Sequence, residues 1–405
     1  MTLLPVEQAK LKILKSVRTT GAENVAVRDG ANRVLAKDLK AKRNQPPFAA
    51  SAMDGYAVKA GDIVKVPAKL SVIGEAPAGR QFAGSLKTGQ AVRIFTGAPV
   101  PRGADTVIMQ ENTSHQDSAR EGDLVIIKQT AAKANFIRPA GLDFKKGEVV
   151  LRADTVLNAR NIGLCAAMNY AKVPVRKRPT VAILATGDEL VEPGGKLGAD
   201  QIVSSNSVAL AAAVSAFGGK PIDLGIAGDN LKDIERAIQK AATADILITI
   251  GGASVGDHDL IGPAFANMGI KRNFWKIAMR PGKPLIFATR GKQRILGLPG
   301  NPVSSLVCAR IFLKPLIEEM LGLEGADETG QARLTTPLPT NDLRQDYIRA
   351  KLSRNDRGQL LVTPFSMQDS SMQKTLALSD ALIVRPPHAK GVKPGCIVSY
   401  LPIKF

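Results

Sequence analysis

The sequence has few of the side chains on which several classes of protein depend. Its three cysteines (Cys165, Cys308 and Cys396) lie far apart, so they make neither a disulfide framework nor a zinc knuckle. Aromatic residues form only 4% of the chain, which leaves few platforms for stacking single-stranded nucleic acid. No apolar run approaches the roughly 18 residues of a membrane span, and the first residues lack the pattern of a secretion signal. We therefore expect a cytoplasmic protein that binds neither nucleic acid nor a membrane.

What the chain does have is an excess of positive charge, with 55 Lys and Arg against 36 Asp and Glu. A basic protein can bind nucleic acid, an anionic membrane surface or small anionic substrates. The basic residues are scattered rather than gathered in blocks, which favours an enzyme that handles phosphate or another oxyanion. At 405 residues the chain exceeds one ordinary core, so about two to four domains are expected.

Three apolar runs between Pro179 and Gly322 break into polar, glycine-rich turns, and the chain is organised around them. The runs are 181–185, 245–250 and 295–298. Short apolar runs bounded by glycine are typical of strands buried on both faces, and their alternation with helical segments predicts a mainly parallel sheet. Ligands of such sheets bind at the carboxyl ends of the strands. The sequence therefore predicts an α/β domain with its site at that edge.

Helical patterns and capping residues fill the spaces between these strands. Ser204–Ser207 is an N-cap cluster for a helix over 208–217. A strand over 222–226 is followed by Gly228–Asn230, which caps a helix over 231–242. The last strand leads into a long helical pattern that continues to Met320.

The flanking segments have other patterns. Residues 4–19 and 158–169 are predicted as helices, and the basic, proline-bounded stretch 173–179 as a linker. Short alternating segments over 70–150 indicate a β-rich module. Five short strand candidates after Gly322 indicate a small barrel: 333–338, 347–352, 360–363, 381–384 and 396–401. The predicted fold class is a multidomain α/β protein with an N-terminal α+β arm and a C-terminal β-barrel.

Charged side chains are expected to meet where the strands of the α/β domain end: Asp188, Glu189, Asp229, Asp257, Asp259, Lys276, Arg280 and Lys283. Hard carboxylates without cysteine or histidine partners suit Mg²⁺. We assign Glu189, Asp257 and Asp259 as its ligands. Two like charges as close as Asp257 and Asp259 would repel unless a cation lies between them.

Two glycine motifs at this edge allow different chemistry. Gly297–Pro302 is not a Walker loop, but we expect it to form a phosphate cradle, because this glycine turn enters a helix that contains Ser304 and Ser305. Gly252–Gly256 matches the pattern of a nucleophile elbow. Asp257-His-Asp259 follows it where a helix should start at once, which disfavours a serine nucleophile.

Two polar residues near the N-terminus have open interpretations. Asp54, in Met53-Asp-Gly-Tyr56, is at a turn and can be an Asx-turn aspartate or a functional carboxylate. Thr96 follows a strand end and can be a turn hydroxyl or an oxyanion ligand.

Six motifs, taken together and in register, resemble the MoeA family of molybdopterin molybdenumtransferases, which includes the C-terminal domain of gephyrin. They are Pro46–Val58, Thr96–Pro101, Thr186–Leu190, Gly251–Asp259, Arg280–Pro284 and Gly297–Ser304. The resemblance covers essentially the whole chain. It implies insertion of molybdate into adenylyl-molybdopterin, with release of AMP and assistance from Mg²⁺. It also implies a homodimer with transient contacts to the adenylyltransferase and to receiving molybdoenzymes.

The resemblance also implies domain bounds and site residues. The dimer arm would comprise 1–48 and 146–178, the β-rich module 49–145, the molybdopterin-binding α/β domain 179–325 and the barrel 326–405. Implied catalytic residues are Asp54, Thr96, Glu189, Asp257, Asp259, Lys276, Arg280 and Lys283. Implied substrate-binding residues are Asp143, Asp229, Gly251, Gly252, Ser254, Pro299, Gly300, Asn301, Ser304, Arg349 and Ser370.

One position departs from the family pattern, and two other functions compete. Arg280 stands where many relatives carry lysine, and a guanidinium fork can hold a phosphate or molybdate bidentately where an ammonium cannot. An adenylyltransferase of the same α/β fold is one alternative, although it should need neither the N-terminal module nor the barrel. A scaffold that binds partner peptides is the other, against which the set of carboxylates counts.

Overall fold

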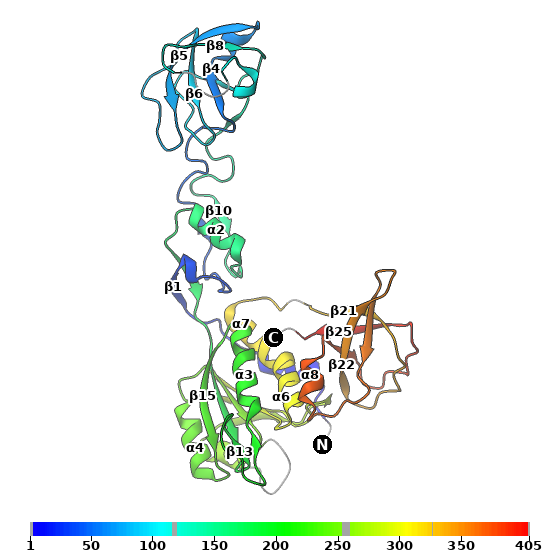
Figure 1. Ribbon diagram of the computed structural model, residues 1–405. Coiled ribbons are helices and arrows are strands. Elements are labelled where there is room, and N and C mark those ends of the chain that lie inside the picture. Colours follow the sequence, from blue (N-terminus) through cyan, green and yellow to red (C-terminus); the bar gives the residue numbers. More distant parts are fainter. Residues whose placement is uncertain (1–2, 116–119, 253–259, 326, 404–405) are drawn as a thin grey trace. The chain divides into compact units, whose positions relative to one another are not determined.

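The computed structural model describes residues 3–115, 120–252, 260–325 and 327–403. The chain divides into two compact units, Met1–Glu23 with Arg176–Phe405 and Asn24–Val175 (Figure 1). The first predicted helix is shorter than expected: α1 (Val6–Leu14) follows Pro5, and Ser16 has a φ of 58°. It belongs to the first unit, because Leu4 forms a bridge with Ile277 and α1 contacts the helix near Met320.

A six-stranded sheet lies at the centre of the first unit, in the order β15-β12-β16-β20-β19-β17. Four strands run parallel: β12 (Thr180–Thr186), β15 (Lys220–Ala227), β16 (Ile246–Ile250) and β20 (Gln293–Leu298). The antiparallel strands β17 (Lys271–Trp275) and β19 (Ile286–Arg290) extend one side. The prediction of an α/β chain with a mainly parallel sheet is confirmed, whereas the β17–β19 hairpin was not predicted.

Helices cover both faces of this sheet (Figure 1). They are α3 (Ser205–Ala216), α4 (Leu231–Lys240), α5 (Ile261–Asn267), α6 (Pro302–Cys308) and α7 (Lys314–Leu321). Asn230 caps α4 as predicted, with its side chain accepting from the Asp233 amide. The long helix expected to reach Met320 is interrupted by a π-helical turn over Ala309–Leu313, and it ends at Gly322, whose φ is 77°. A short parallel pair, β13 (Leu190–Val191) and β14 (Ile202–Val203), precedes α3.

Five strands after residue 326 close into a barrel, each overlapping a predicted segment: β21 (Gly330–Leu334), β22 (Gln345–Arg354), β23 (Leu360–Pro364), β24 (Ala381–Arg385) and β25 (Ile397–Pro402). The pairing of β22 with both β23 and β24 completes the ring. The helix α8 (Gln373–Ala377) was not predicted. A short strand of the α/β part, β18 (Met279–Arg280), pairs with β22 and joins the barrel sheet.

The second unit contains a five-stranded sheet in the order β7-β4-β6-β5-β8. Its strands are β4 (Gly55–Val58), β5 (Ala68–Ala76), β6 (Gln90–Ile94), β7 (Thr106–Met109) and β8 (Leu124–Ile127). The prediction missed β4. A smaller core surrounds α2 (Ala159–Ala167), whose start is held by a capping box between Asn158 and Asn161.

Short strand pairs complete the second unit. They are β1 (Ala22–Ala26) with β11 (Lys172–Arg176), β2 (Leu39–Lys40) with β10 (Val149–Leu151), and β3 (Ala50–Ser51) with β9 (Ile137–Arg138). Across the described ranges of both units, no helix has the length and apolar character needed to span a membrane.

The interior strand β4 depends on its first residue. A Cβ added at Gly55 would overlap the carbonyl oxygen of Ile108 on the neighbouring strand β7. We expect Gly55→Ala to lower the free energy of unfolding by about 1–3 kcal/mol, the usual cost of overpacking. Gly61→Ala is the matched control, since a Cβ there meets nothing within 4 Å. Equal denaturation midpoints for the two variants would contradict this account of β4.

Candidate functional site

The parallel strands bring their terminal turns together at one edge of the sheet, as predicted. After β12, the Gly187 amide donates to the Ala227 carbonyl at the end of β15 (3.3 Å). After β16, the Gly251 amide donates to the Leu298 carbonyl at the end of β20 (3.2 Å). Gly251 and Gly252 have φ values of 88° and 58°, which let the chain turn directly after β16. A polar ligand at this edge would therefore be reached from four turns.

Two aspartates hold the turns after β12 and β15 to each other. The Asp229 amide donates to Oδ1 of Asp188 (3.0 Å), and the Asp188 amide lies 3.4 Å from Oδ2 of Asp229. Glu189 is exposed beside them, and its carboxylate folds over the α-carbon of the buried Gly187, where a side chain would otherwise stand. Asp229 is thus partly structural, while Glu189 presents its charge at the edge.

Of the three proposed metal ligands, Glu189 lies in the described part of the chain. Asp257, Asp259 and Ser254 lie outside the described residues. Within the described ranges, no group of three or more His, Cys, Asp or Glu side chains could hold a metal ion. The Glu189 carboxylate occupies the space that Gly187 leaves free. Its two oxygen atoms are hard donors, which Mg²⁺ prefers. Glu189 therefore fits the ion, and the three-ligand set stays a prediction.

The loop after β20 is held from two directions. Asn206 at the start of α3 donates from Nδ2 to the Gly300 carbonyl (2.6 Å). On the barrel side, Asn301 donates from Nδ2 to Oγ of Ser370 (2.8 Å), and the Val303 amide donates to the Ser370 carbonyl (3.1 Å). Ser370 is 69 residues from Asn301 in the chain, so the fold completes this edge with a barrel segment.

The helix that follows this loop carries buried hydroxyl groups. Pro299 and Ser304 are buried, and neighbouring Ser305 has an Oγ without a hydrogen-bond partner in the described part of the chain. Asn206 was missed as a site residue because its sequence context, Ser-Ser-Asn-Ser, indicated only a helix cap. The N-cap residue Ser204 in fact makes no capping hydrogen bond from its side chain.

Two of the three predicted cations, Lys276 and Lys283, have no carboxylate partner among the residues that the structure describes. Lys276 has a φ of 69°, and its Nζ lies 4.0 Å from the centroid of the Trp275 ring. Lys283 is exposed and forms no hydrogen bond or ion pair through its side chain with any described residue. Both lie in the connection between β17 and β19, so their ammonium groups remain able to bind an anion.

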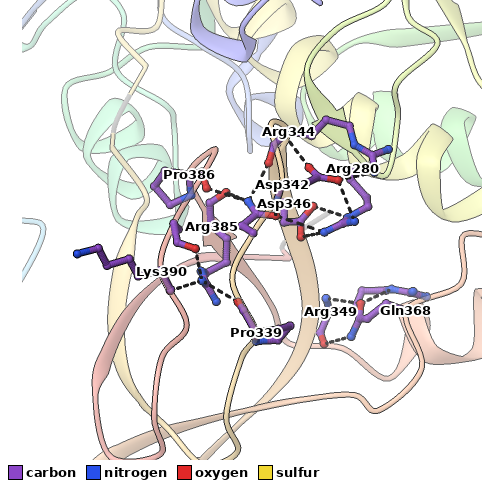
Figure 2. A network of polar contacts seen from close by, with 12 residues as sticks. Arg280, Pro339, Asp342, Arg344, Asp346, Arg349, Gln368, Arg385, Pro386 and Lys390 are labelled. Atoms are coloured by element: carbon purple, nitrogen blue, oxygen red, sulfur yellow. Dashed lines mark hydrogen bonds and ion pairs between the residues drawn. The ribbon is translucent and has the colours of Figure 1, made fainter.

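Arg280, the third predicted cation, is paired with a carboxylate (Figure 2). Its Nε donates to Oδ1 of Asp346 (2.6 Å) and its Nη2 donates to Oδ2 of the same carboxylate. Asp342 and Asn341 lie 3.4 Å and 3.3 Å from the remaining donors. The hydrogen bond with Asp346 raises the pKa of Arg280. The fork expected to hold an anion bidentately therefore holds a barrel carboxylate and joins β18 to β22.

Arg349 lies inside the same barrel region (Figure 2). Its side chain is buried, with Nε 3.3 Å from Oε1 of Gln368 and Nη1 3.4 Å from the Met372 carbonyl. Burial lowers the pKa of Arg349, and the charge of Asp369 opposes that shift. Gln368 and Met372 flank Ser370 in sequence, so Arg349 supports the segment that contacts the Gly300 loop.

The second unit contains Asp54, Thr96 and Asp143. Oδ1 of Asp54 accepts from both the amide and the hydroxyl of Thr96, at 2.7 Å each. The amide hydrogen bond is the main cause that lowers the pKa of Asp54. Asp54, an exposed residue, thus bonds to a residue 42 positions away, which disfavours the local Asx-turn interpretation and leaves Oδ2 without a hydrogen-bond partner among the described residues. Asp143 is exposed, and its amide donates to the Gln45 carbonyl (2.9 Å).

Comparison with known proteins decides the family. Three family models match: "MoeA N-terminal region (domain I and II)" over residues 4–169, "Probable molybdopterin binding domain" over 182–319 and "MoeA C-terminal region (domain IV)" over 331–403. A protein of Nostoc sp. named molybdopterin molybdenumtransferase is 39% identical over 92% of this chain and 87% of its own length. A Haemophilus influenzae protein of the same name is 34% identical over 99% and 98%. The chain belongs to the MoeA family.

A solved MoeA-family structure has the same fold. The molybdopterin biosynthesis MoeA protein of Pyrococcus horikoshii superposes with a TM-score of 0.81 at 30% identity, covering 98% of this chain and 99% of that one. The resemblance read from the six sequence motifs is therefore confirmed along the whole chain.

Arg93, which acts on Asp54 through its charge, belongs to none of the six sequence motifs. The buried guanidinium of Arg93 donates to the Gly55 carbonyl (3.4 Å) and to Oε1 of Gln110 (2.5 Å). It lies over the rings of Tyr56 and Phe95, 5.1 Å and 5.2 Å from their centroids. Its positive charge also lowers the pKa of Asp54. A basic residue inside the apolar strand Ala91–Ile94 was the available clue.

Thr96→Val should raise the pKa of Asp54 toward its ordinary value. The variant keeps the amide hydrogen bond but loses the hydroxyl, which stabilises the charged carboxylate. Because the folded-state pKa of Asp54 is depressed, the stability it contributes is present at neutral pH and is lost as the pH falls through that value. NMR titration of the Asp54 carboxyl carbon measures the shift. Thr340→Val, an exposed barrel substitution, should leave it unchanged; an identical titration in Thr96→Val would show that the hydroxyl is irrelevant.

Arg280→Gln should lower the free energy of unfolding of the first unit by about 1–3 kcal/mol, because the buried carboxylate of Asp346 would lose its charged partner. Arg236→Gln is the control, since its ion pair with Asp233 is exposed and worth about 0.5 kcal/mol or less. Urea denaturation compares the two. Unchanged stability of Arg280→Gln together with weakened molybdate dependence would instead make Arg280 an anion ligand.

Proposed function

We propose that this chain is a molybdopterin molybdenumtransferase that inserts molybdate into adenylyl-molybdopterin and releases AMP. The observation that carries the proposal is the convergence at one sheet edge of the Glu189 turn, the Gly300 loop and Ser370 from the barrel. The full-length similarity to proteins of that name supports the same substrate class.

The chain's own residues supply positioning and charge. Lys283 and Lys276 attract molybdate and the adenylyl phosphate, because neither ammonium is neutralised by a carboxylate within the described residues. The loop at Gly300 and Asn301, fixed by Asn206 and Ser370, orients the substrate against the sheet edge. Mg²⁺, held by Glu189 with Asp257 and Asp259, would neutralise charge on the phosphate oxygens.

The N-terminal unit takes part through Asp54 and Thr96, with Asp143 as a further contact. The amide and hydroxyl of Thr96 fix Oδ1 of Asp54 and keep the carboxylate ionised, so that Oδ2 can accept a hydrogen bond from substrate or water. In the proposed assembly these residues act across a cytoplasmic homodimer. We include transient contacts with the adenylyltransferase and the receiving molybdoenzymes in the same proposal.

We also propose the domain bounds that the resemblance implies. The dimer arm comprises 1–48 with 146–178, the β-rich module 49–145, the α/β domain 179–325 and the barrel 326–405.

Molybdate-dependent release of AMP from adenylyl-molybdopterin tests this function. We expect Glu189→Gln, which keeps shape but removes charge, to lower the rate at least tenfold without changing the melting temperature. Glu192→Gln is the matched control, three residues away and also exposed. A rate of AMP release that does not depend on the molybdate concentration would refute the proposal. Adenylylated product accumulating from molybdopterin and Mg-ATP without molybdate would favour the adenylyltransferase alternative.

A further inference from the structure

A polar groove lies at the edge of the sheet opposite the candidate site, where the parallel strands begin. Its volume is about 770 Å³. Its walls are the connector 16–21 after α1, the turn 242–245 before β16 and the β19–β20 turn over 290–294. Because parallel strands place their two ends at opposite edges, this groove does not overlap the turns that form the candidate site.

The charges that line this groove are unbalanced. Four basic side chains line it: Arg18, Arg290, Lys292 and Arg294. Asp245 is the acidic residue in its lining, and Oδ2 of that carboxylate already accepts from the amide and hydroxyl of Thr180, at 2.7 Å each. Within the described ranges, none of the four basic side chains forms an ion pair.

The two half-buried arginines are held by neutral oxygen atoms. Arg290 donates from Nε to Gln293 (3.1 Å) and from Nη2 to the Ile238 carbonyl (3.3 Å). Arg294 donates from Nη2 to the Lys15 carbonyl (2.8 Å), and its buried Nε has no acceptor in the described structure. Burial lowers the pKa of both groups. Neutral acceptors therefore orient these guanidiniums but leave their charge uncompensated.

Buried arginines elsewhere in the fold are held in both ways, Arg349 by neutral oxygens of Gln368 and Met372 and Arg310 by a carboxylate. Arg310, which is 4% exposed, donates to the carboxylate of Glu328, and Lys314 lies 3.3 Å from the same carboxylate. Removing charge from water is costly unless a counter-charge is near. At the groove an anion from solution could supply that counter-charge.

We propose that this groove binds a small anion that carries a phosphate group. Planar guanidiniums match phosphate oxygens, and the hydroxyl groups of Ser16, Thr19 and Thr243 line the same space. No aromatic residue is among the described residues that line the groove, so these offer no surface on which a nucleobase could stack. The ligand class is inorganic phosphate or a phosphate monoester without a base. This site is additional to the proposed catalytic edge and does not depend on it.

Calorimetric titration with inorganic phosphate, and separately with glycerol phosphate, tests the site against sodium chloride of equal ionic strength. We expect saturable binding, weakened at least tenfold in Arg290→Gln/Arg294→Gln. Binding of phosphate alone would identify the free ion, and tighter binding of the ester would identify an organic phosphate. Arg357→Gln, an exposed barrel residue, is the charge-matched control.

Two single lysine variants test where the anion binds. Lys283→Gln, at the opposite edge, should retain this binding; its loss there would place the anion at the catalytic edge and overturn the proposal. If the double arginine variant does not fold, Lys292→Gln, whose side chain is exposed, should weaken binding about threefold or more. Equal binding by wild type and Lys292→Gln in that case, or binding only of long polyanions such as heparin, would also overturn it.

Discussion

The parallel pairing of β12 with β15 and β16, and of β16 with β20, is the constraint on which the rest of this structure depends. A strand buried on both faces can carry almost no polar side chain, so chemistry is confined to the turns at its ends. Parallel pairing then sends every such turn to the same edge. The glycines Gly187, Gly251 and Gly252 follow from this, because the backbone must leave a crowded edge at once and with positive φ.

The sheet edge is nevertheless incomplete without the barrel. The barrel segment at Ser370 fixes the Gly300 loop, and Gln373 donates to the hydroxyl of Ser205 at the start of α3 (2.6 Å). Arg280 and Asp346 bind β18 to β22 beside these contacts. The buried carboxylate would be costly alone, so the pair favours one specific docking of barrel on sheet over others. Arg280 thereby gains an architectural role from its guanidinium geometry.

Local sequence patterns predicted the elements whose cause is local. Buried strands such as β16 and the Asn230 cap of α4 were found because apolar runs and capping residues act within a few positions. The strand β4 was missed because its four residues begin with a glycine, whose need is set by Ile108 on another strand. The partners of Arg280, Asn206 and Asp54 lie 66, 94 and 42 residues away, so only the fold could reveal them.

The two edges of the central sheet use positive charge in different ways, and this explains why a net charge of +19 need not indicate nucleic acid. At the carboxyl edge, Lys276 and Lys283 lie in the connection between β17 and β19, and Glu189 and Asp229 lie in the turns after β12 and β15, so this edge carries charges of both signs. At the amino edge, Arg290 and Arg294 face a groove whose carboxylate is already bound to Thr180. Charges of both signs suit a site that must bind a metal and release a product, because the carboxylates offset the attraction of the lysines for an anion. An excess of positive charge suits simple retention of an anion, since Asp245, the described carboxylate in the groove, is already bound to Thr180.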